Sequence, residues 1–185
     1  AAFPAQTYVR ITGDCPLAEA GLVDQVLNFF WDNDLEYART GDTFPDGLDV
    51  EAFDRLSLFS AANLARESYD REHVTPFIRR HAQRAAVLEN TADYSRLRLT
   101  VDEQEDFGVI QGIFDAFGHN AFSFGDVANL VENQPELFVA NRHIVRDEGS
   151  IIGTGQKLWK RATRVIPGGS MLFSKKAELF SPTKW

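Results

Sequence analysis

Apolar and polar residues alternate along the first 146 residues in blocks that favour strands and helices in turn. Short runs rich in β-branched and aromatic residues predict strands, at 7–12, 36–40, 48–53, 86–89 and 96–101. Apolar residues at helical spacing predict helices, at 20–32, 54–66, 68–81, 103–117 and 123–132. This alternation is typical of an α/β protein with a three-layer, mainly parallel sheet.

The helix predicted at 103–117 carries two different signals. Its apolar residues recur at Phe107, Ile110, Phe114 and Phe117, which predicts a buried face. Asp106 lies instead among the acidic residues of the first turn, where negative charge suits the helix dipole.

Composition and charge narrow the function classes. The net charge of -8 argues against a nucleic-acid binder, which needs a basic surface to neutralise phosphates. No apolar run is long enough for a membrane span, and residues 1–6 lack a signal-peptide pattern, so we expect a cytoplasmic protein. A single cysteine excludes an internal disulfide framework, and we expect Cys15 to be a small buried residue.

Two predicted strand ends carry the same pattern, Arg-x-Thr-x-Asp, at 10–14 and 98–102. Because strand side chains alternate with period two, the arginine, threonine and aspartate of each run share one face. Ligands of such sheets bind beyond the carboxyl ends of the strands. If the two strands are neighbours, Asp14 and Asp102 meet at that edge, with Arg10 and Arg98 behind them.

Paired carboxylates at this edge suit Mg²⁺, which takes one or two carboxylates together with phosphate oxygens and water. The arginines could bind a phosphate or a substrate carboxylate in a bidentate manner. The alternative interpretation is that both aspartates cap the following helices and both arginines lie in solvent. For either strand alone the two interpretations carry equal weight, and the repetition of the pattern favours a site.

Two further segments carry candidate binding residues. Asp46, Asp49 and Glu51 lie in a turn-rich loop, 44–51, and could accept hydrogen bonds from sugar hydroxyls, although composition alone favours a solvated turn. In the second segment, 71–76, arginine and histidine at a helix N-terminus suit an anion, although a lone histidine is more often structural.

Four motifs in this order resemble the cytidylyltransferase family of the spore-coat polysaccharide type, which is related to the acylneuraminate and 3-deoxy-manno-octulosonate cytidylyltransferases. They read VRITGDCPL at 9–17, FPDGLDVE at 44–51, REHVTP at 71–76 and LRLTVD at 97–102. The resemblance implies a nucleotide-diphospho-sugar transferase fold and the transfer of CMP from CTP to a sugar, with release of pyrophosphate, for surface polysaccharide synthesis. Relatives in the family are often dimers, which suggests a homodimer, although the sequence itself does not fix the oligomeric state.

The resemblance assigns roles to the residues already singled out. It places Asp14 and Asp102 at the Mg²⁺ site. The repeated pattern puts Arg10 and Arg98 nearby, as the candidate catalytic residues that orient anions. The sugar is expected at residues of the second and third motifs, namely Asp46, Gly47, Asp49, Glu51, Arg71, Glu72, His73 and Thr75.

One part of the family pattern is missing from the sequence. Members of the family begin with a strand and a basic loop that hold CTP, and no such segment precedes Thr7. We therefore expect a sheet that is incomplete at the N-terminus and a chain that is inactive alone, with the activity belonging to a longer parent. The alternative is a non-catalytic interaction fragment.

The C-terminal residues resemble a different family. Residues 147–155 are glycine-rich and predict a linker between a cytidylyltransferase region at 1–146 and a second domain that begins at 156–185. The run LWKRATRVIPGG at 158–169 resembles the opening of class III aminotransferases of the glutamate-1-semialdehyde type. Pyridoxal phosphate would belong only to the missing downstream domain. On a further interpretation, this chain is the leader of such an aminotransferase.

Overall fold

The computed structural model describes residues 4–144 and 146. The chain divides into two units, Ala1–His143 and Ile144–Trp185, and the described residues fall almost entirely in the first. The predicted linker and the aminotransferase-like segment lie outside the described residues. No helix in the described part is both long and apolar enough to cross a membrane.

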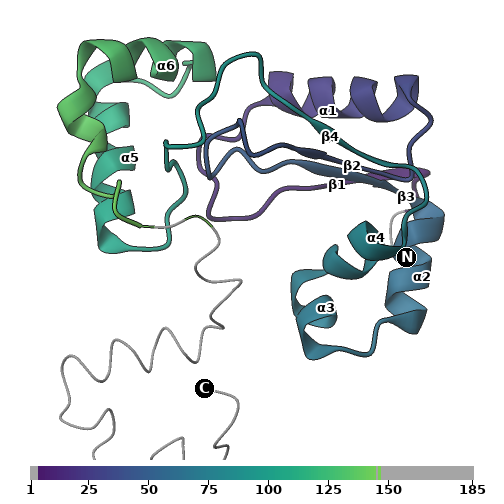
Figure 1. Cartoon of the computed structure of the whole chain (residues 1–185). Coiled ribbons are helices and arrows are strands. Elements are labelled where there is room, and N and C mark those ends of the chain that lie inside the picture. The colour runs from purple at the N-terminus through teal and green to yellow at the C-terminus, as the bar shows by residue number, and fades with distance from the viewer. Residues whose placement is uncertain (1–3, 145, 147–185) are drawn as a thin grey trace, which may run out of the picture. The chain divides into compact units, whose positions relative to one another are not determined.

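The described elements alternate between strands and helices, which confirms the α/β class (Figure 1). In chain order they are β1 (Thr7–Arg10), α1 (Ala20–Asp32), β2 (Tyr37–Thr40), β3 (Glu51–Asp54), α2 (Arg55–Leu64), α3 (Ser68–His73), α4 (Pro76–His81), β4 (Ala85–Leu88), α5 (Gln104–Phe117), α6 (Phe124–Asn133) and the 3₁₀ helix η1 (Pro135–Phe138).

The four strands form one sheet in the order β1-β3-β2-β4. Strand β3 runs antiparallel to both β1 and β2, whereas β2 and β4 are parallel. Strands β1, β2 and β4 therefore share one direction, and the reversed β3 makes the sheet mixed rather than mainly parallel in its pairing. The reason is the connection between β2 and β3, which contains no helix and returns the chain directly beside the strand it left.

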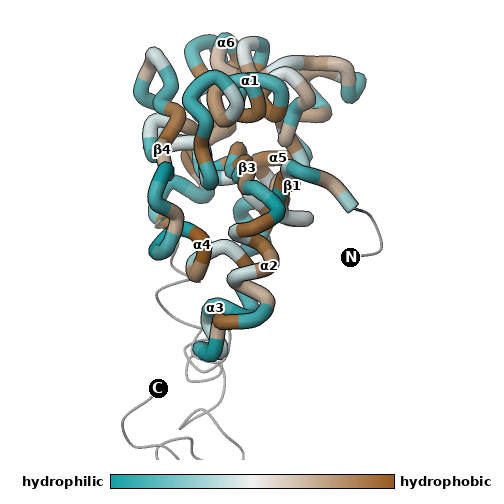
Figure 2. Tube along the Cα trace, turned by 90° about the vertical axis from the view of Figure 1, so that its right-hand side faces the viewer, coloured by the Kyte–Doolittle hydropathy of each residue, from teal (hydrophilic) through white to brown (hydrophobic). Residues whose placement is uncertain are grey.

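Helices cover both faces of the sheet (Figures 1 and 2). On one face α1 buries Leu22, Val26 and Phe30 against the sheet, as its periodicity predicted. On the other face Ala61 of α2 and Ile78 of α4 pack against two sheet residues, Tyr37 and Phe53. A separate apolar cluster joins α5 and α6 to η1 and to Leu99.

The segment 68–81 forms two helices rather than the single predicted one. Helix α3 ends at His73. The next residue, Val74, has a φ of 68°, in the left-handed region that a β-branched residue rarely adopts. The backbone N–H of Thr75 then donates to the carbonyl of His73 at 2.8 Å, which closes a tight γ-turn. Pro76 begins α4, at a position where its missing N–H costs nothing.

Helix α5 confirms its predicted range but presents a different face to the core. Its buried residues are Asp106, Val109, Ile110 and Ile113, whereas Phe107 is half exposed. A carboxylate thus occupies the position at which the apolar pattern predicted an aromatic ring. Its partner, described below, explains why the helix turns that way.

The segment 96–101 is not a strand, although the sequence predicted one. Its only strand-like pairing among the described residues is an isolated bridge between Arg98 and Asp46. Leu99 and Thr100 are nevertheless buried. Both sides of the segment therefore face protein. Its backbone N–H groups donate to carbonyls of neighbouring loops, Asp46 and Asp14, instead of to a strand of the sheet.

Candidate functional site

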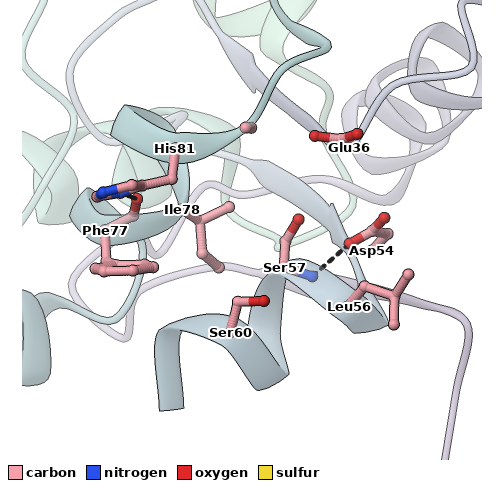
Figure 3. A pocket seen from close by; sticks show the side chains of 9 residues that line it. Glu36, Asp54, Leu56, Ser57, Ser60, Phe77, Ile78 and His81 are labelled. Carbon is pink, nitrogen blue, oxygen red and sulfur yellow. Dashed lines mark hydrogen bonds between the residues drawn. The ribbon is translucent and has the colours of Figure 1, made fainter. Parts of the chain in front are cut away.

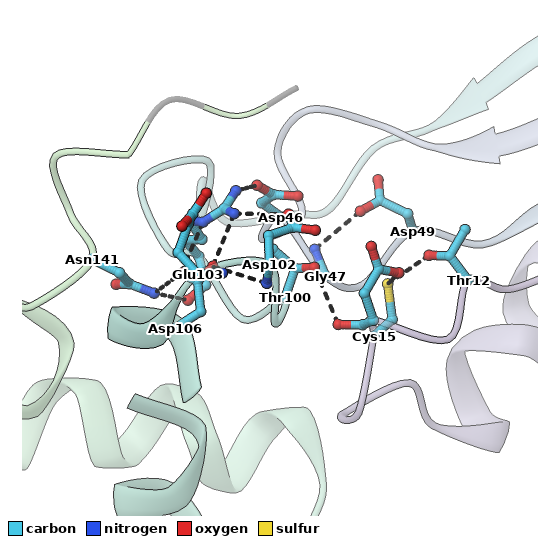
Figure 4. A network of polar contacts seen from close by, with 12 residues as sticks. Thr12, Cys15, Asp46, Gly47, Asp49, Thr100, Asp102, Glu103, Asp106 and Asn141 are labelled. Carbon is cyan, nitrogen blue, oxygen red and sulfur yellow. Dashed lines mark hydrogen bonds and ion pairs between the residues drawn. The ribbon is translucent and has the colours of Figure 1, made fainter. Parts of the chain in front are cut away.

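Arg98 lies at the centre of a buried polar network, with only 7% of its side chain exposed. Its Nη1 donates to Asp46 at 2.5 Å and its Nη2 donates to Asp102 at 2.9 Å. Nε and Nη2 together grip the two oxygens of Asp106, each at 2.9 Å (Figure 4). One guanidinium therefore joins a loop residue, a residue before α5 and a residue inside α5.

These contacts shift the pKa values of Arg98 and Asp106. Burial opposes the charged form of Arg98, but hydrogen bonds and the negative charge of its carboxylate partners raise its pKa above the ordinary value. Burial likewise opposes the charged form of Asp106, and hydrogen bonds from Arg98, Asn141 and two backbone N–H groups hold its pKa below the ordinary value. Three carboxylates thus surround one guanidinium, so negative charge is in excess.

The two predicted metal ligands come from adjacent segments of backbone. The carbonyl oxygen of Asp14 accepts hydrogen bonds from the N–H of Val101 at 2.9 Å and from Oγ1 of Thr100 at 3.1 Å. Asp14 therefore lies beside the residue that precedes Asp102. The side chain of Asp102 is 37% exposed, so solvent and ligands can reach it.

The route to this arrangement differs from the predicted one. Strand β1 ends at Arg10 and pairs with β3, so the Arg-x-Thr-x-Asp run at 10–14 is not one strand face. The helix-cap alternative is also wrong, because the N-cap positions of the helices that follow are occupied by Glu19 and Glu103 and not by the two aspartates. A turn at 12–15, and not a neighbouring strand, brings Asp14 to the 98–102 segment.

The loop between β2 and β3 lies against the same segment. The N–H of Asp46 donates to Leu97 and its carbonyl accepts from Leu99, while Asp49 accepts from the N–H of Gly47 at 3.0 Å. Figure 4 shows Gly47 and Thr100 between the Arg98 network and the turn that holds Thr12 and Cys15. Gly47 has a φ of 99°, and a Cβ there would meet the backbone of residues 99 and 100 at 2.4 Å.

Replacing Gly47 with alanine is therefore expected to lower the free energy of unfolding by about 3 kcal/mol, from backbone strain and overpacking together. Urea denaturation measures the effect. Gly108→Ala is the matched control, since Gly108 lies in α5 with open space around it. That change should stabilise the protein by about 0.5–1 kcal/mol. Equal effects of the two substitutions would contradict this account of Gly47.

A second group of predicted residues gathers around Glu51. Oε2 of Glu51 accepts from Nη1 of Arg10 at 2.6 Å and from Oγ1 of Thr75 at 2.9 Å, while Oε1 accepts from the hydroxyl of Tyr37 at 2.5 Å. Burial, with the adjacent carboxylate, raises the pKa of Tyr37, so its hydroxyl stays a donor. Arg10 is thus tied to Glu51, and no described contact joins it to Arg98.

The predicted residues at 71–73 are less enclosed. Arg71 and Glu72 are exposed, and the ring of His73 contacts Tyr69 with ring centroids 4.5 Å apart. The neighbouring Asp70 is 4% exposed and pairs with Arg80, and its Oδ1 has no hydrogen-bond partner among the described residues. The left-handed turn at Val74 then presents Thr75 to Glu51.

Cys15 is buried, as expected, beside Thr12 and Asp14. Burial raises the pKa of its thiol to about 11. At pH 8 we therefore expect Cys15 to react with iodoacetamide about 100-fold more slowly in the folded protein than in urea, since the thiolate is the nucleophile. Mass spectrometry over a time course measures both rates, and a rate in the folded protein as fast as in urea would show that the thiol is accessible and ionised.

A cavity of about 230 Å³ between α2 and α4 contains none of the predicted site residues (Figure 3). Glu36, Asp54, Ser57 and His81 line it. It lies at the end of the sheet where β1 begins and β3 ends, and the Arg10–Glu51 pair lies at the other end of the same two strands. It is therefore separate from the candidate site.

The described side chains contain no group of three or more histidine, cysteine, aspartate or glutamate residues that could enclose a metal. Asp14 and Asp102 supply hard oxygen donors from adjacent backbone segments, beside a network with excess negative charge. Two protein carboxylates, completed by phosphate oxygens and water, are the usual set for Mg²⁺. The residues present therefore fit that ion, with a substrate providing the other ligands.

Three residues that organise this region were not predicted from the sequence as parts of a site: Tyr37, Asp106 and Asn141. Asn141 is 2% exposed and its Nδ2 donates to the carbonyl of Arg98 and to Oδ1 of Asp106, each at 2.9 Å. Only Asp106 left a signal in the sequence, because Arg98, Asp102 and Asp106 recur every four residues. The first-turn position of Asp106 had instead favoured an interaction with the helix dipole.

Comparison with known proteins gives consistent matches. The model of a protein family described as Cytidylyltransferase matches residues 1–141. The chain is 29% identical over 146 residues to an uncharacterized protein of Methanocaldococcus jannaschii, covering 77% of this chain and 60% of that protein. It is 27% identical over 134 residues to the spore coat polysaccharide biosynthesis protein SpsF of Bacillus subtilis, covering 69% of this chain and 55% of that protein.

A solved structure also matches, that of a cytidylyltransferase from Leptospira borgpetersenii serovar Hardjo-bovis. The TM-score is 0.67 at 28% identity, and the match covers 72% of this chain and 58% of that one. The chain thus spans less than two thirds of the length of each of these relatives.

Proposed function

The chain belongs to the cytidylyltransferase family, and from that premise we propose that it forms part of an enzyme that transfers CMP from CTP to a sugar. The sugar hydroxyl oxygen bonds to the α-phosphorus of CTP, the bond from that phosphorus to the bridging oxygen of the β-phosphate breaks, and pyrophosphate and the hydroxyl proton leave. The similarity to a spore coat polysaccharide protein supports a sugar as the acceptor.

The observation that carries the proposal is the meeting of the Asp14 and Asp102 segments beside the Arg98 network. Asp14 and Asp102 would hold Mg²⁺. That ion, when bound, neutralises charge on the triphosphate and polarises the attacked phosphorus. The charge around Arg98 supports this assignment. One guanidinium cannot balance the carboxylates of Asp46, Asp102 and Asp106, so the group that includes Asp102 carries excess negative charge.

Sugar hydroxyls would meet polar groups on both sides of the β2–β3 loop. Asp49 presents carboxylate oxygens, whereas Glu51 is 14% exposed and positions Arg10 and Thr75, which donate to it. Arg98 takes a different role from the one the sequence suggested. Its guanidinium is 7% exposed and occupied by three carboxylates, so it orients Asp46 and Asp102 rather than binding substrate.

The test is pyrophosphate release by the full-length protein, supplied with Mg²⁺, CTP and a panel of sugars that includes neutral, amino and acidic ones. We expect release that requires both CTP and one class of sugar, with the CMP-sugar identified by mass spectrometry. Equal release with ATP, GTP or UTP would refute a cytidylyltransferase assignment. Release without any sugar would refute the proposed acceptor.

A further inference from the structure

We propose that Asp106 and Asn141 are positioning residues, which act through Arg98 to hold Asp102 and Asp46 in a fixed mutual arrangement. Asp102 belongs to the proposed metal end of the site and Asp46 to the loop proposed to meet the sugar, so this inference rests on the proposed function. Neither Asp106 nor Asn141 touches a ligand in this account, because both are buried, at 0% and 2% exposure.

Every part of the Asp106 carboxylate is engaged. Oδ1 accepts from Nε of Arg98 and Nδ2 of Asn141, each at 2.9 Å. Oδ2 accepts from Nη2 of Arg98 at 2.9 Å and from the N–H groups of Asp102 and Glu103 at 3.1 and 3.0 Å. Five hydrogen bonds leave this side chain a single orientation.

The fork formed by Arg98 and Asp106 transmits that orientation. A guanidinium is planar and its donors have fixed directions, so two parallel bonds to one carboxylate set the plane of the whole group. The remaining directions are then determined, with Nη1 toward Asp46 and Nη2 toward Asp102. The backbone N–H of Asp102 also donates a hydrogen bond to Asp106, which holds Asp102 by its backbone as well. Asp106 thus holds Asp102 from two sides.

Asn141, near the C-terminal end of the described residues, holds two members of the network. Its amide Nδ2 bridges the carbonyl of Arg98 and Oδ1 of Asp106. A buried amide with two such acceptors holds both the backbone and the carboxylate partner of the arginine. The residue is contributed by the turn after η1, 43 positions from Arg98 in the sequence.

The experiment measures Mn²⁺, as a spectroscopic substitute for Mg²⁺, bound to the full-length protein in the presence of CTP by electron paramagnetic resonance. Asp106→Asn is expected to weaken Mn²⁺ binding by about 10-fold or more, the range typical of partners that orient metal ligands. Asn141→Ala removes a neutral donor and should weaken it by a smaller factor. In kinetics, the KM for the sugar should rise along with the loss of metal affinity, because Asp46 shifts together with Asp102.

Asp126→Asn is the matched control. Asp126 occupies the same third helical position in α6, where its Oδ2 accepts from the backbone of Ser123 at 2.8 Å, but it has no arginine partner in any described contact. It should leave Mn²⁺ binding unchanged. A folded Asp106→Asn protein that binds Mn²⁺ like the parent would overturn the inference. If that variant does not fold, Asn141→Ala decides in the same way.

Asp102→Asn, measured in parallel, separates this inference from the proposed function. If Asp102→Asn leaves Mn²⁺ binding intact, the proposed metal ligand is wrong. If Asp102→Asn weakens binding but neither Asp106→Asn nor Asn141→Ala does, the metal ligand stands and the positioning role is wrong.

Discussion

Replacing Asp102 with asparagine is expected to lower kcat/KM for CMP transfer by about 10³-fold, more than the 10–100-fold typical of residues that only orient metal ligands. The amide keeps the size of the side chain but removes the charge that would hold Mg²⁺. It also removes one of the two carboxylates to which Nη2 of Arg98 donates, each at 2.9 Å, and leaves Asp106 as the other. The variant should therefore need a higher Mg²⁺ concentration for its half-maximal rate, and its maximal rate should be lower.

Pyrophosphate release by the full-length protein over a series of Mg²⁺ concentrations measures both effects. Asp115→Asn is the control, because Asp115 is an exposed aspartate on α5 and should change neither. Asp14→Asn should behave like Asp102→Asn, since the two residues lie on adjacent backbone segments. A normal rate and Mg²⁺ dependence in Asp102→Asn would show that this carboxylate holds no metal.

Replacing Arg98 with methionine is expected to lower the free energy of unfolding at pH 7 by about 4 kcal/mol, since removal of one partner leaves buried charge uncompensated. Asp46, Asp102 and Asp106 would then face one another around an apolar side chain. Arg84→Met is the control. Arg84 is half exposed and pairs with Asp34 and Glu36 at the surface, so its loss should cost less than about 1 kcal/mol.

The destabilisation by Arg98→Met should also depend on pH. In the parent protein the pKa of Asp106 is lowered, so its contribution is complete above the ordinary value of 3.8 and is lost as the pH falls through the lower, folded value. Without Arg98 the same carboxyl is favoured in its protonated form. Urea denaturation should therefore show a gap between the two proteins that is widest near neutrality and narrows towards pH 3. A gap that is constant with pH would contradict the buried network.

Much of the fold was predictable because it follows local pattern. Helix α1 has the predicted range, 20–32, since its apolar stripe faces a sheet and nothing competes with it. Helix α5 shows the limit of such reasoning. The pattern placed Phe107 inside, but Arg98 draws Asp106 into the core and Phe107 turns outward. A buried ion pair outweighed the apolar pattern, and periodicity carries no information about pairs of this kind.

The site was partly predictable for the same reason. The repeated Arg-x-Thr-x-Asp pattern correctly indicated that the segments of Asp14 and Asp102 meet, as the contacts of Asp14 with residues 100 and 101 confirm. It did not indicate that Arg10 and Arg98 would have separate partners, Glu51 and Asp106. Glu51 lies 41 positions from Arg10, so that pair depends on which loops lie together. Asp106 follows Arg98 by eight positions, but a spacing alone does not separate a buried ion pair from acidic residues at the start of a helix.

The Arg98 network has a consequence for how the protein is made. Its contacts join residues 52 and 43 positions apart in the chain, to Asp46 and to Asn141. Such long-range closures are slow steps in folding, because chain entropy is lost before the contacts form. During synthesis the sheet and α1 can pack first, whereas the network waits for residue 141 to leave the ribosome. The bonds from Asn141 to the carbonyl of Arg98 and to Asp106 can therefore form only when nearly all of this unit has been synthesised.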